Sequence, residues 1–160
     1  MLPLGSLRIA PGAGVYATPH SAFNFDFDLT AGFRLGMMVD DVWIAPLIEA
    51  GYSYHGGDRA QGEGDYFVAG GGLSVGTIEV AATIVPAYIV GDADGDLVHG
   101  MRTALRADFW MGIWSIEAAH EWRSVRSTDV HSIRFTLTID FGILLSWALR
   151  ASGPRPEPTE

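Results

Sequence analysis

Hydrophobic and polar residues alternate along residues 23 to 37 almost without a break. One parity of this segment is apolar and consists of Phe23, Phe25, Phe27, Leu29, Ala31, Phe33, Leu35 and Met37. The other parity consists of Asn24, Asp26, Asp28, Thr30, Gly32, Arg34 and Gly36. Period-two alternation predicts a β-strand with one apolar and one charged face. Globular strands usually have about 5 or 6 residues, whereas about 9 to 11 tilted residues cross a bilayer, so this strand is long enough to span a membrane.

The same period-two pattern recurs between turn signals along most of the chain. It predicts eight strands, at residues 6 to 17, 22 to 38, 42 to 55, 65 to 76, 78 to 90, 98 to 111, 113 to 125 and 131 to 147. Short turns are expected at residues 39–41, 76–77 and 112–113, and longer links at 18–21, 56–64, 91–97 and 126–130. Alternating short and long connections are typical of an up-and-down barrel with both termini at one end.

Composition narrows the class of protein. The chain has 160 residues, 20 of them glycine, a formal charge of -9 and no cysteine. The acidic balance argues against a nucleic-acid partner, and the lack of cysteine excludes disulfides and thiolate metal sites. No apolar run reaches the roughly 18 residues of a transmembrane helix. Residues 1 to 8 lack the features of a secretory signal, so either a signal was removed or the protein is not exported.

The charged residues of the predicted strands gather on one face of the sheet. This face carries Arg8, Asp26, Asp28, Arg34, Glu49, Glu79, Arg102, Arg106, Asp108, Glu117, Glu121, Arg123, Arg134 and Asp140. Six arginines face eight carboxylates there, a near balance that suits a salt-bridged interior. The same parity is rich in small residues that fit a narrow lumen, among them Gly12, Gly51, Gly72 and Thr136.

Alternation alone allows two orientations. A soluble lipocalin-like barrel would enclose the apolar parity around a ligand, whereas a membrane barrel encloses the charged parity. Large aromatic residues near the strand ends favour the membrane orientation, because such residues form girdles at the two bilayer interfaces. The predicted interface aromatics are Tyr52, Tyr54, Tyr88, Trp114, Trp122 and Trp147.

The end of the eighth predicted strand resembles the C-terminal β-signal of bacterial outer-membrane barrels. Asp140 matches its polar position, Gly142 its glycine, and Leu145 and Trp147 its hydrophobic pair, although the chain continues after Trp147. With eight strands, residues 6 to 147 look like the small OmpA/OmpX type of outer-membrane barrel. The resemblance implies an eight-stranded antiparallel up-and-down transmembrane β-barrel with a polar, charged lumen, inserted by the barrel-assembly machinery.

The charged lumen has two interpretations, a gated narrow conduit or an electrostatic core that fills a closed barrel. We expect the core, since eight strands leave room only for side chains or one small ligand. The histidines, His20, His55, His99, His120 and His131, are expected near the loop side as solvated rim residues. His120, Ser124 and His131 with Ser132 suggest a lipid-modifying enzyme, but no acidic partner completes a triad.

The sequence therefore predicts one barrel domain over residues 1–150 and a disordered proline-rich tail over 151–160. The expected role is that of a non-catalytic, monomeric protein of the Gram-negative outer membrane, without metal or cofactor. Its predicted partners are membrane lipid, the barrel-assembly machinery and, through the loops, other proteins or lipopolysaccharide. A soluble ligand-binding barrel, a narrow channel and a lipid-modifying enzyme remain as alternatives.

Overall fold

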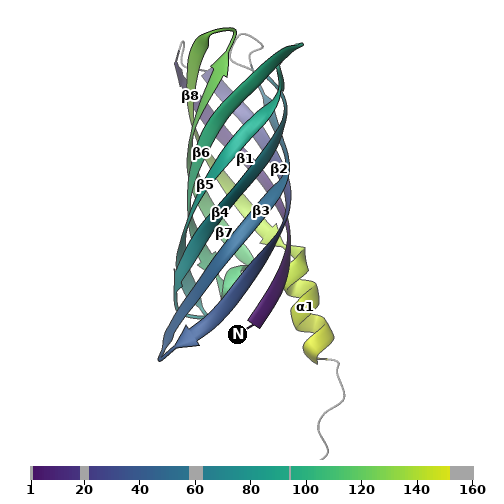
Figure 1. Cartoon of the computed structure of the whole chain (residues 1–160), viewed down its shortest axis with the longest axis vertical. Coiled ribbons are helices and arrows are strands. Elements are labelled where there is room, and N and C mark those ends of the chain that lie inside the picture. The colour runs from purple at the N-terminus through teal and green to yellow at the C-terminus, as the bar shows by residue number, and fades with distance from the viewer. Residues whose placement is uncertain (1, 19–21, 58–62, 94, 152–160) are drawn as a thin grey trace, which may run out of the picture.

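Eight antiparallel strands close into a barrel in the computed structural model, which confirms the predicted fold class (Figure 1). The structure describes residues 2–18, 22–57, 63–93 and 95–151. The strands are β1 (Leu2–Thr18), β2 (Ala22–Val39), β3 (Val42–Gly56), β4 (Gly64–Gly76), β5 (Val80–Ala93), β6 (Asp96–Phe109), β7 (Trp114–Val125) and β8 (Thr128–Asp140). A 3-10 helix, η2 (Trp110–Gly112), joins β6 to β7, and a helix, α1 (Phe141–Ala151), follows β8.

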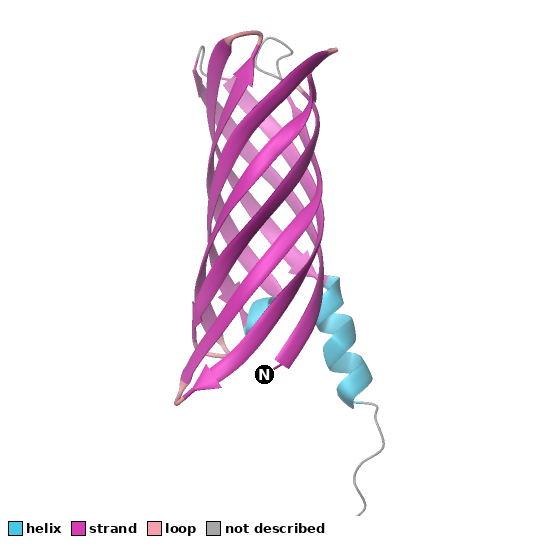
Figure 2. Ribbon diagram, viewed as in Figure 1, coloured by secondary structure: helices cyan, strands magenta, loops and turns pink. Residues whose placement is uncertain are grey.

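Each strand pairs with its neighbours in sequence, and β1 closes the barrel on β8. Ala13 lies opposite Phe135 and Val15 opposite Ile133 in this closing pair. This pairing runs from Arg8 to Thr18, so the sheet has no free edge over that length of β1. Figure 2 shows long, strongly tilted strands with both described chain ends at the lower end of the barrel. We call that end the turn end, because it also holds the β2–β3, β4–β5 and β6–β7 connections, and the opposite end the loop end.

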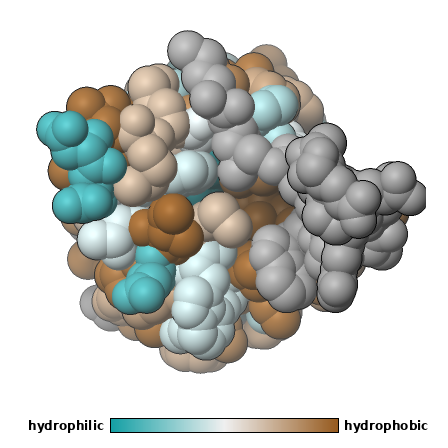
Figure 3. Space-filling model, turned by 90° about the horizontal axis from the view of Figure 1, so that it is seen from below, coloured by the Kyte–Doolittle hydropathy of each residue, from teal (hydrophilic) through white to brown (hydrophobic). Residues whose placement is uncertain are grey.

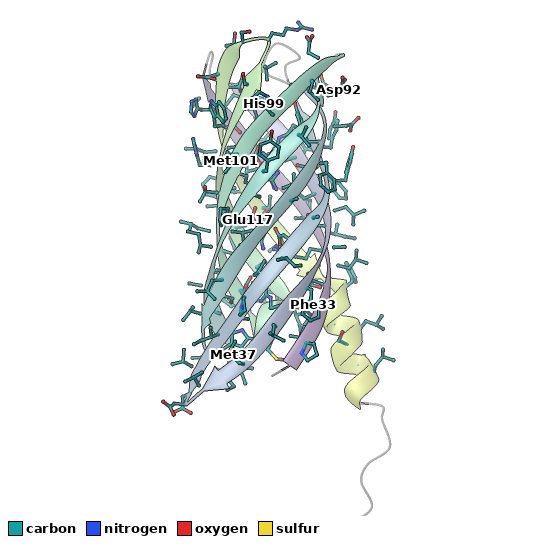
Figure 4. The ribbon with its side chains drawn as sticks, viewed as in Figure 1. Phe33, Met37, Asp92, His99, Met101 and Glu117 are labelled. Carbon is teal, nitrogen blue, oxygen red and sulfur yellow. The ribbon has the colours of Figure 1, made fainter. Side chains whose placement is uncertain are left out.

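The two parities separate as the alternation predicts. Phe33 and Met101 point away from the barrel, whereas Glu117 lies within it (Figure 4). The charged face is thus the lumen face, and the orientation of a soluble barrel with an apolar interior is wrong for this chain. The two parities separate because the pleat of a β-strand directs successive side chains to opposite faces.

Glu79 is the exception among the charged residues assigned to the lumen. The predicted fifth strand began at residue 78, but β5 begins at Val80 and Glu79 is exposed in the β4–β5 turn. The turn closes with a hydrogen bond from Thr77 N to Val80 O of 2.7 Å. Backbone carbonyls of Ile78 and Glu79 accept from Met111 N and Trp110 N, both at 2.8 Å, so these residues join two turns instead of extending a strand.

Two of the predicted longer links are also wrong. The segment 91–97 mostly continues β5 and β6, which leaves residues 94–95 between them, and Gly95 N donates to Asp92 Oδ1 at 2.9 Å. The segment 126–130 reduces to Arg126 and Ser127, with φ of 49° and 63°. Two consecutive positive φ values define the tight hairpin turn that matches strand twist. In both segments, polar residues that were expected in a link belong to the strands, so these strands are longer than their apolar alternation indicates.

The eighth strand ends at Asp140, seven residues before the predicted end at Trp147. Asp140 caps α1, because its Oδ1 accepts from Ile143 N at 3.0 Å. The same oxygen accepts from Leu7 N at 3.0 Å, and Ser6 Oγ donates to Oδ2 at 2.5 Å. The Asp140 carboxylate thus binds the backbone N–H of Leu7, which a longer eighth strand would otherwise pair with. Aspartate is also a preferred N-cap residue.

Gly142 allows α1 to pack closely on β1. A Cβ at this position would lie 2.7 Å from Leu7 N and 2.8 Å from Gly5 O, which is too close for a side chain. Within the described residues no helix has the length and apolarity needed to cross a membrane, and α1 itself has 11 residues. The predicted tail, apart from Ala151 at the end of α1, lies outside the described residues.

Replacement of Asp140 by alanine is expected to destabilise the protein by about 1–2 kcal/mol, because it removes the helix cap. Urea unfolding in detergent micelles measures the change. Asp129→Ala, at an exposed position of the same strand, is the control and is expected to stay within about 0.5 kcal/mol of the parent. Equal losses in the two variants would contradict the capping role.

Candidate functional site: a charged lumen closed at both ends

The inward positions of the strands bring together thirteen of the fourteen ionisable residues assigned to the lumen face. All thirteen are buried, and Glu79 alone lies outside, in its turn. The buried set is Arg8, Asp26, Asp28, Arg34, Glu49, Arg102, Arg106, Asp108, Glu117, Glu121, Arg123, Arg134 and Asp140. A buried charge is costly unless it is paired, so the contacts among these side chains decide whether the arrangement is stable.

Arg102 and Arg134 hold the first group of carboxylates. Arg102 Nε donates to Glu121 Oε1 at 2.5 Å and its Nη1 to Asp28 Oδ2 at 2.9 Å. Its third donor, Nη2, reaches Ser53 Oγ at 2.9 Å. Arg134 donates to both oxygens of Asp28, and its Nη1 lies 3.5 Å from Glu121 Oε1. Two arginines therefore share two carboxylates.

Arg106 organises a second group around Glu49. Its two terminal nitrogens bind the Glu49 carboxylate bidentately, at 2.5 and 2.8 Å, and its Nε donates to Glu117 Oε2 at 2.5 Å. Arg8 Nη1 donates to the same Glu49 at 3.2 Å. The planar guanidinium fork suits this geometry, since it presents several donors in fixed directions.

The two groups form one network. Arg134 Nη2 lies 3.7 Å from Glu117 Oε1 and so joins the Asp28 group to the Glu49 group. Closer to the turn end, Arg34 Nη1 donates to Asp108 Oδ2 at 3.1 Å, and Thr83 Oγ1 donates to the same oxygen at 2.6 Å. The residues of the network and of this pair come from every strand except β4.

His55 belongs to this network, although it was expected at the solvated rim. Its Nδ1 lies 2.9 Å from Asp26 Oδ1 and its Nε2 lies 3.4 Å from Glu121 Oε2. The side chain is fully buried. The sequence pattern could have identified this position, because His55 has the same parity as Glu49 and Ser53, which face inward on β3.

An apolar layer covers the network at the loop end. It consists of Tyr16, Tyr66, Val68, Ala87, Ile89, Ala93, Val98, Val125 and Val130. Arg123 lies directly beneath it, with its Cζ 5.4 Å from the centre of the Tyr16 ring and 5.1 Å from that of Tyr66. Cation–π contacts of this kind stabilise a guanidinium group that is removed from water. The loop-end mouth is thus closed by apolar side chains.

A second apolar layer closes the turn end. Leu4, Trp43, Ala45 and Ala81 project inward from the strands, and Ile143 enters this cluster from α1. Gly36 provides the space for the indole, since a Cβ there would overlap the Trp43 ring. Sequence reasoning missed both layers because it treated the inward parity as uniformly polar and small. The apolar inward residues near the strand ends were the available signal.

The other candidate residues lie on the outer wall. His120 Nε2 is 3.2 Å from His131 Nδ1, and both rings face outward. Ser132 is buried in the lumen, so the barrel wall separates its hydroxyl from both imidazoles. His99 and Ser124 face outward in the same region, and His20 lies outside the described residues. Among the described residues, no group of three or more His, Asp or Glu side chains is arranged to hold a metal ion.

The predicted interface aromatics divide between the two ends. Tyr52, Tyr54, Tyr88 and Trp122 lie on strands toward the loop end, and Trp114 begins β7 at the turn end. Trp147 is in α1 rather than in a strand. Sequence reasoning missed Trp110, which is exposed beside Trp114 at a ring-centre distance of 5.9 Å, because it placed residue 110 inside the sixth strand.

Comparison with known proteins supports the fold. No family model and no curated relative matches this chain. The solved structure of Neisserial surface protein A matches with a TM-score of 0.51 and 11% identity, over 89% of this chain and 99% of that protein. Two structures of Ail from Yersinia pestis match with TM-scores of 0.33 and 0.31, at 11% and 13% identity, over 86% and 88% of this chain and 99% and 100% of Ail. The match to the Neisserial structure covers nearly the whole of both chains, so it confirms the predicted architecture of a small eight-stranded barrel.

Replacement of Arg106 by methionine is expected to cost about 3–5 kcal/mol of folding free energy, because it leaves Glu49 and Glu117 short of a buried partner. The matched control is Arg126→Met, which breaks an exposed pair with Asp96 and is expected to cost about 0–1 kcal/mol. Urea titration in micelles measures both variants. Similar small losses would contradict the view that buried pairing stabilises the barrel.

Proposed function

We propose that this protein is a non-catalytic β-barrel of a Gram-negative outer membrane, with a structural or interactional role. In this proposal the barrel spans the membrane with its turn end in the periplasm and its loop end outside. The loops are then available to partner proteins or lipopolysaccharide. The protein acts as a monomer, and the barrel-assembly machinery inserts it even though residues 141–147 form a helix in place of the strand expected of an insertion signal.

The apolar outer wall is the observation that carries this proposal. Large apolar side chains on every strand face outward and are exposed, with Ile48, Leu105 and Phe135 at 66%, 59% and 61%. Soluble monomers rarely expose contiguous apolar patches larger than a few hundred Å². A surface of this kind around a whole barrel is favourable in lipid, where the closed sheet also satisfies all ladder hydrogen bonds.

The lumen supports a structural role over transport. Apolar layers close both ends, and the charged side chains between them form salt bridges beside a small apolar cluster of Leu47, Val85, Ala104 and Ala119. Passage of an ion would require the opening of an apolar layer and the separation of buried charge pairs. The separation of His120 from Ser132 by the barrel wall likewise disfavours the lipid-modifying enzyme.

The orientation of the outer wall can be tested with Phe135→Arg. An arginine facing the middle of the bilayer is expected to cost about 2–4 kcal/mol and to reduce folding into lipid vesicles. The control is Leu97→Arg, since Leu97 is exposed near the β5–β6 turn at the loop end and an arginine there can reach water. Folding yield into vesicles, read from gel mobility before and after boiling, measures the difference. Full tolerance of arginine at residue 135 would overturn the membrane assignment.

The closed lumen predicts flat current traces for the wild-type protein in planar lipid bilayers. Arg102→Ala and Glu121→Gln serve as comparison variants, because both residues lie in the central network. Discrete wild-type openings whose size changes in these two variants would replace the structural role by a narrow channel.

A further inference from the structure

Helix α1 presents a continuous apolar stripe of exposed side chains. The stripe consists of Phe141, Leu144, Leu145, Ala148 and Leu149, all of them exposed. These residues follow the i, i+3, i+4, i+7, i+8 spacing that places side chains along one helix face. Leu145 and Leu149 expose 59% and 64% of their surface.

The opposite side of α1 is fixed to the barrel. Ile143 is fully buried in the turn-end apolar layer, and Gly142 packs against the β1 backbone. Asp140 caps the helix and binds Leu7 N, while Ser146 Oγ donates to Gly142 O at 2.8 Å within the helix. The contacts of Asp140, Gly142 and Ile143 with the barrel set the rotation of α1 about its own axis, so the stripe faces outward.

The stripe continues the outer apolar wall. Ile139, the last outward residue of β8, and Phe141 are both exposed and separated by only the cap residue. Leu144 and Ala148 of the stripe also line a groove of 550 Å³, together with Ile78, Trp110, Met111 and Ile113. Figure 3 views this end and shows apolar residues near its centre. Exposed tryptophans such as Trp110 are typical of the bilayer interface.

The chemistry of the stripe indicates what covers it. Residues 141–149 contain no ionisable side chain, so this length of helix offers no charge pair to orient a protein partner. A helix that lies at a membrane surface buries its apolar face about 5–10 Å into the boundary between headgroups and acyl chains. We propose that α1 is a phospholipid-binding helix that inserts its apolar stripe into the leaflet at the turn end. This inference rests on the proposed membrane location of the barrel.

Site-directed spin labelling tests the inference, because the chain contains no cysteine of its own. Leu145→Cys and Leu149→Cys, each labelled with a nitroxide, are refolded into vesicles of phosphatidylethanolamine and phosphatidylglycerol. Phe135→Cys on the outer wall and Glu79→Cys in the exposed turn provide references for lipid and water. All four positions are exposed, so the labels do not disturb the core, and heat-dependent gel mobility verifies folding. Collision rates with oxygen and with a water-soluble nickel chelate give the environment of each label.

The expected result is that labels at 145 and 149 resemble the label at 135, with more frequent collisions with oxygen than with the chelate. If they resemble the label at 79 while 135 is in lipid, the lipid-binding role of α1 is wrong and the membrane barrel stands. If the label at 135 is itself in water, the proposed function fails. Spin–spin broadening at 145 and 149 would show a second copy on the stripe and would overturn the lipid assignment.

Discussion

The pairing of enclosed charge is the constraint on which the rest of this structure depends. Six arginines lie in a lumen formed by only eight strands. Arg8, Arg34, Arg102, Arg106 and Arg134 contact carboxylates, and Arg123 lies over two tyrosine rings. Because an unpaired buried charge costs several kcal/mol, the strand register must hold guanidinium and carboxylate groups opposite one another. Arg102 opposite Glu121 and Arg106 opposite Glu117 show this register directly.

The apolar layers follow from the same constraint. Ion pairs are strongest where water is excluded, and the clusters around Tyr66 and Trp43 separate the network from the two mouths. The interior is therefore layered along the barrel axis, with an apolar layer at each end and, between them, the charge network beside the small cluster of Leu47, Val85, Ala104 and Ala119. Such an interior suits a rigid membrane scaffold, whereas a channel needs a continuous polar path. Under the proposed function, the loops and α1 are the surfaces available for interaction.

The sequence predicted the fold well because strand alternation is a local property. Residues 22 to 38 were assigned from parity alone, and β2 spans Ala22–Val39. The same rule predicted which charges are buried. The rule failed at Glu79, where two turns are hydrogen-bonded to each other. His55, expected at the solvated rim, has the inward parity of β3 and so follows the rule.

Side-chain contacts between distant segments could not be read from local pattern. Asp140 fits both a strand and a helix cap, and only its contacts with Ser6 and Leu7 decide between them. The resemblance of residues 140–147 to an insertion signal therefore predicted a strand, whereas the structure has helix α1 from Phe141 onward. The loop-end layer involves residues from six strands, and the turn-end layer involves residues from β1, β3, β5 and α1, so the assembly of both depends on barrel closure.

Refolding from urea tests the central claim most directly. The unfolded chain is diluted in parallel into plain buffer and into detergent micelles, and gel mobility is compared with and without boiling. An apolar outer wall around a paired, charged interior predicts folding only in micelles, with a heat-dependent shift in mobility. A monodisperse, folded protein in plain buffer would contradict the account, because the outer wall described above could not remain exposed to water.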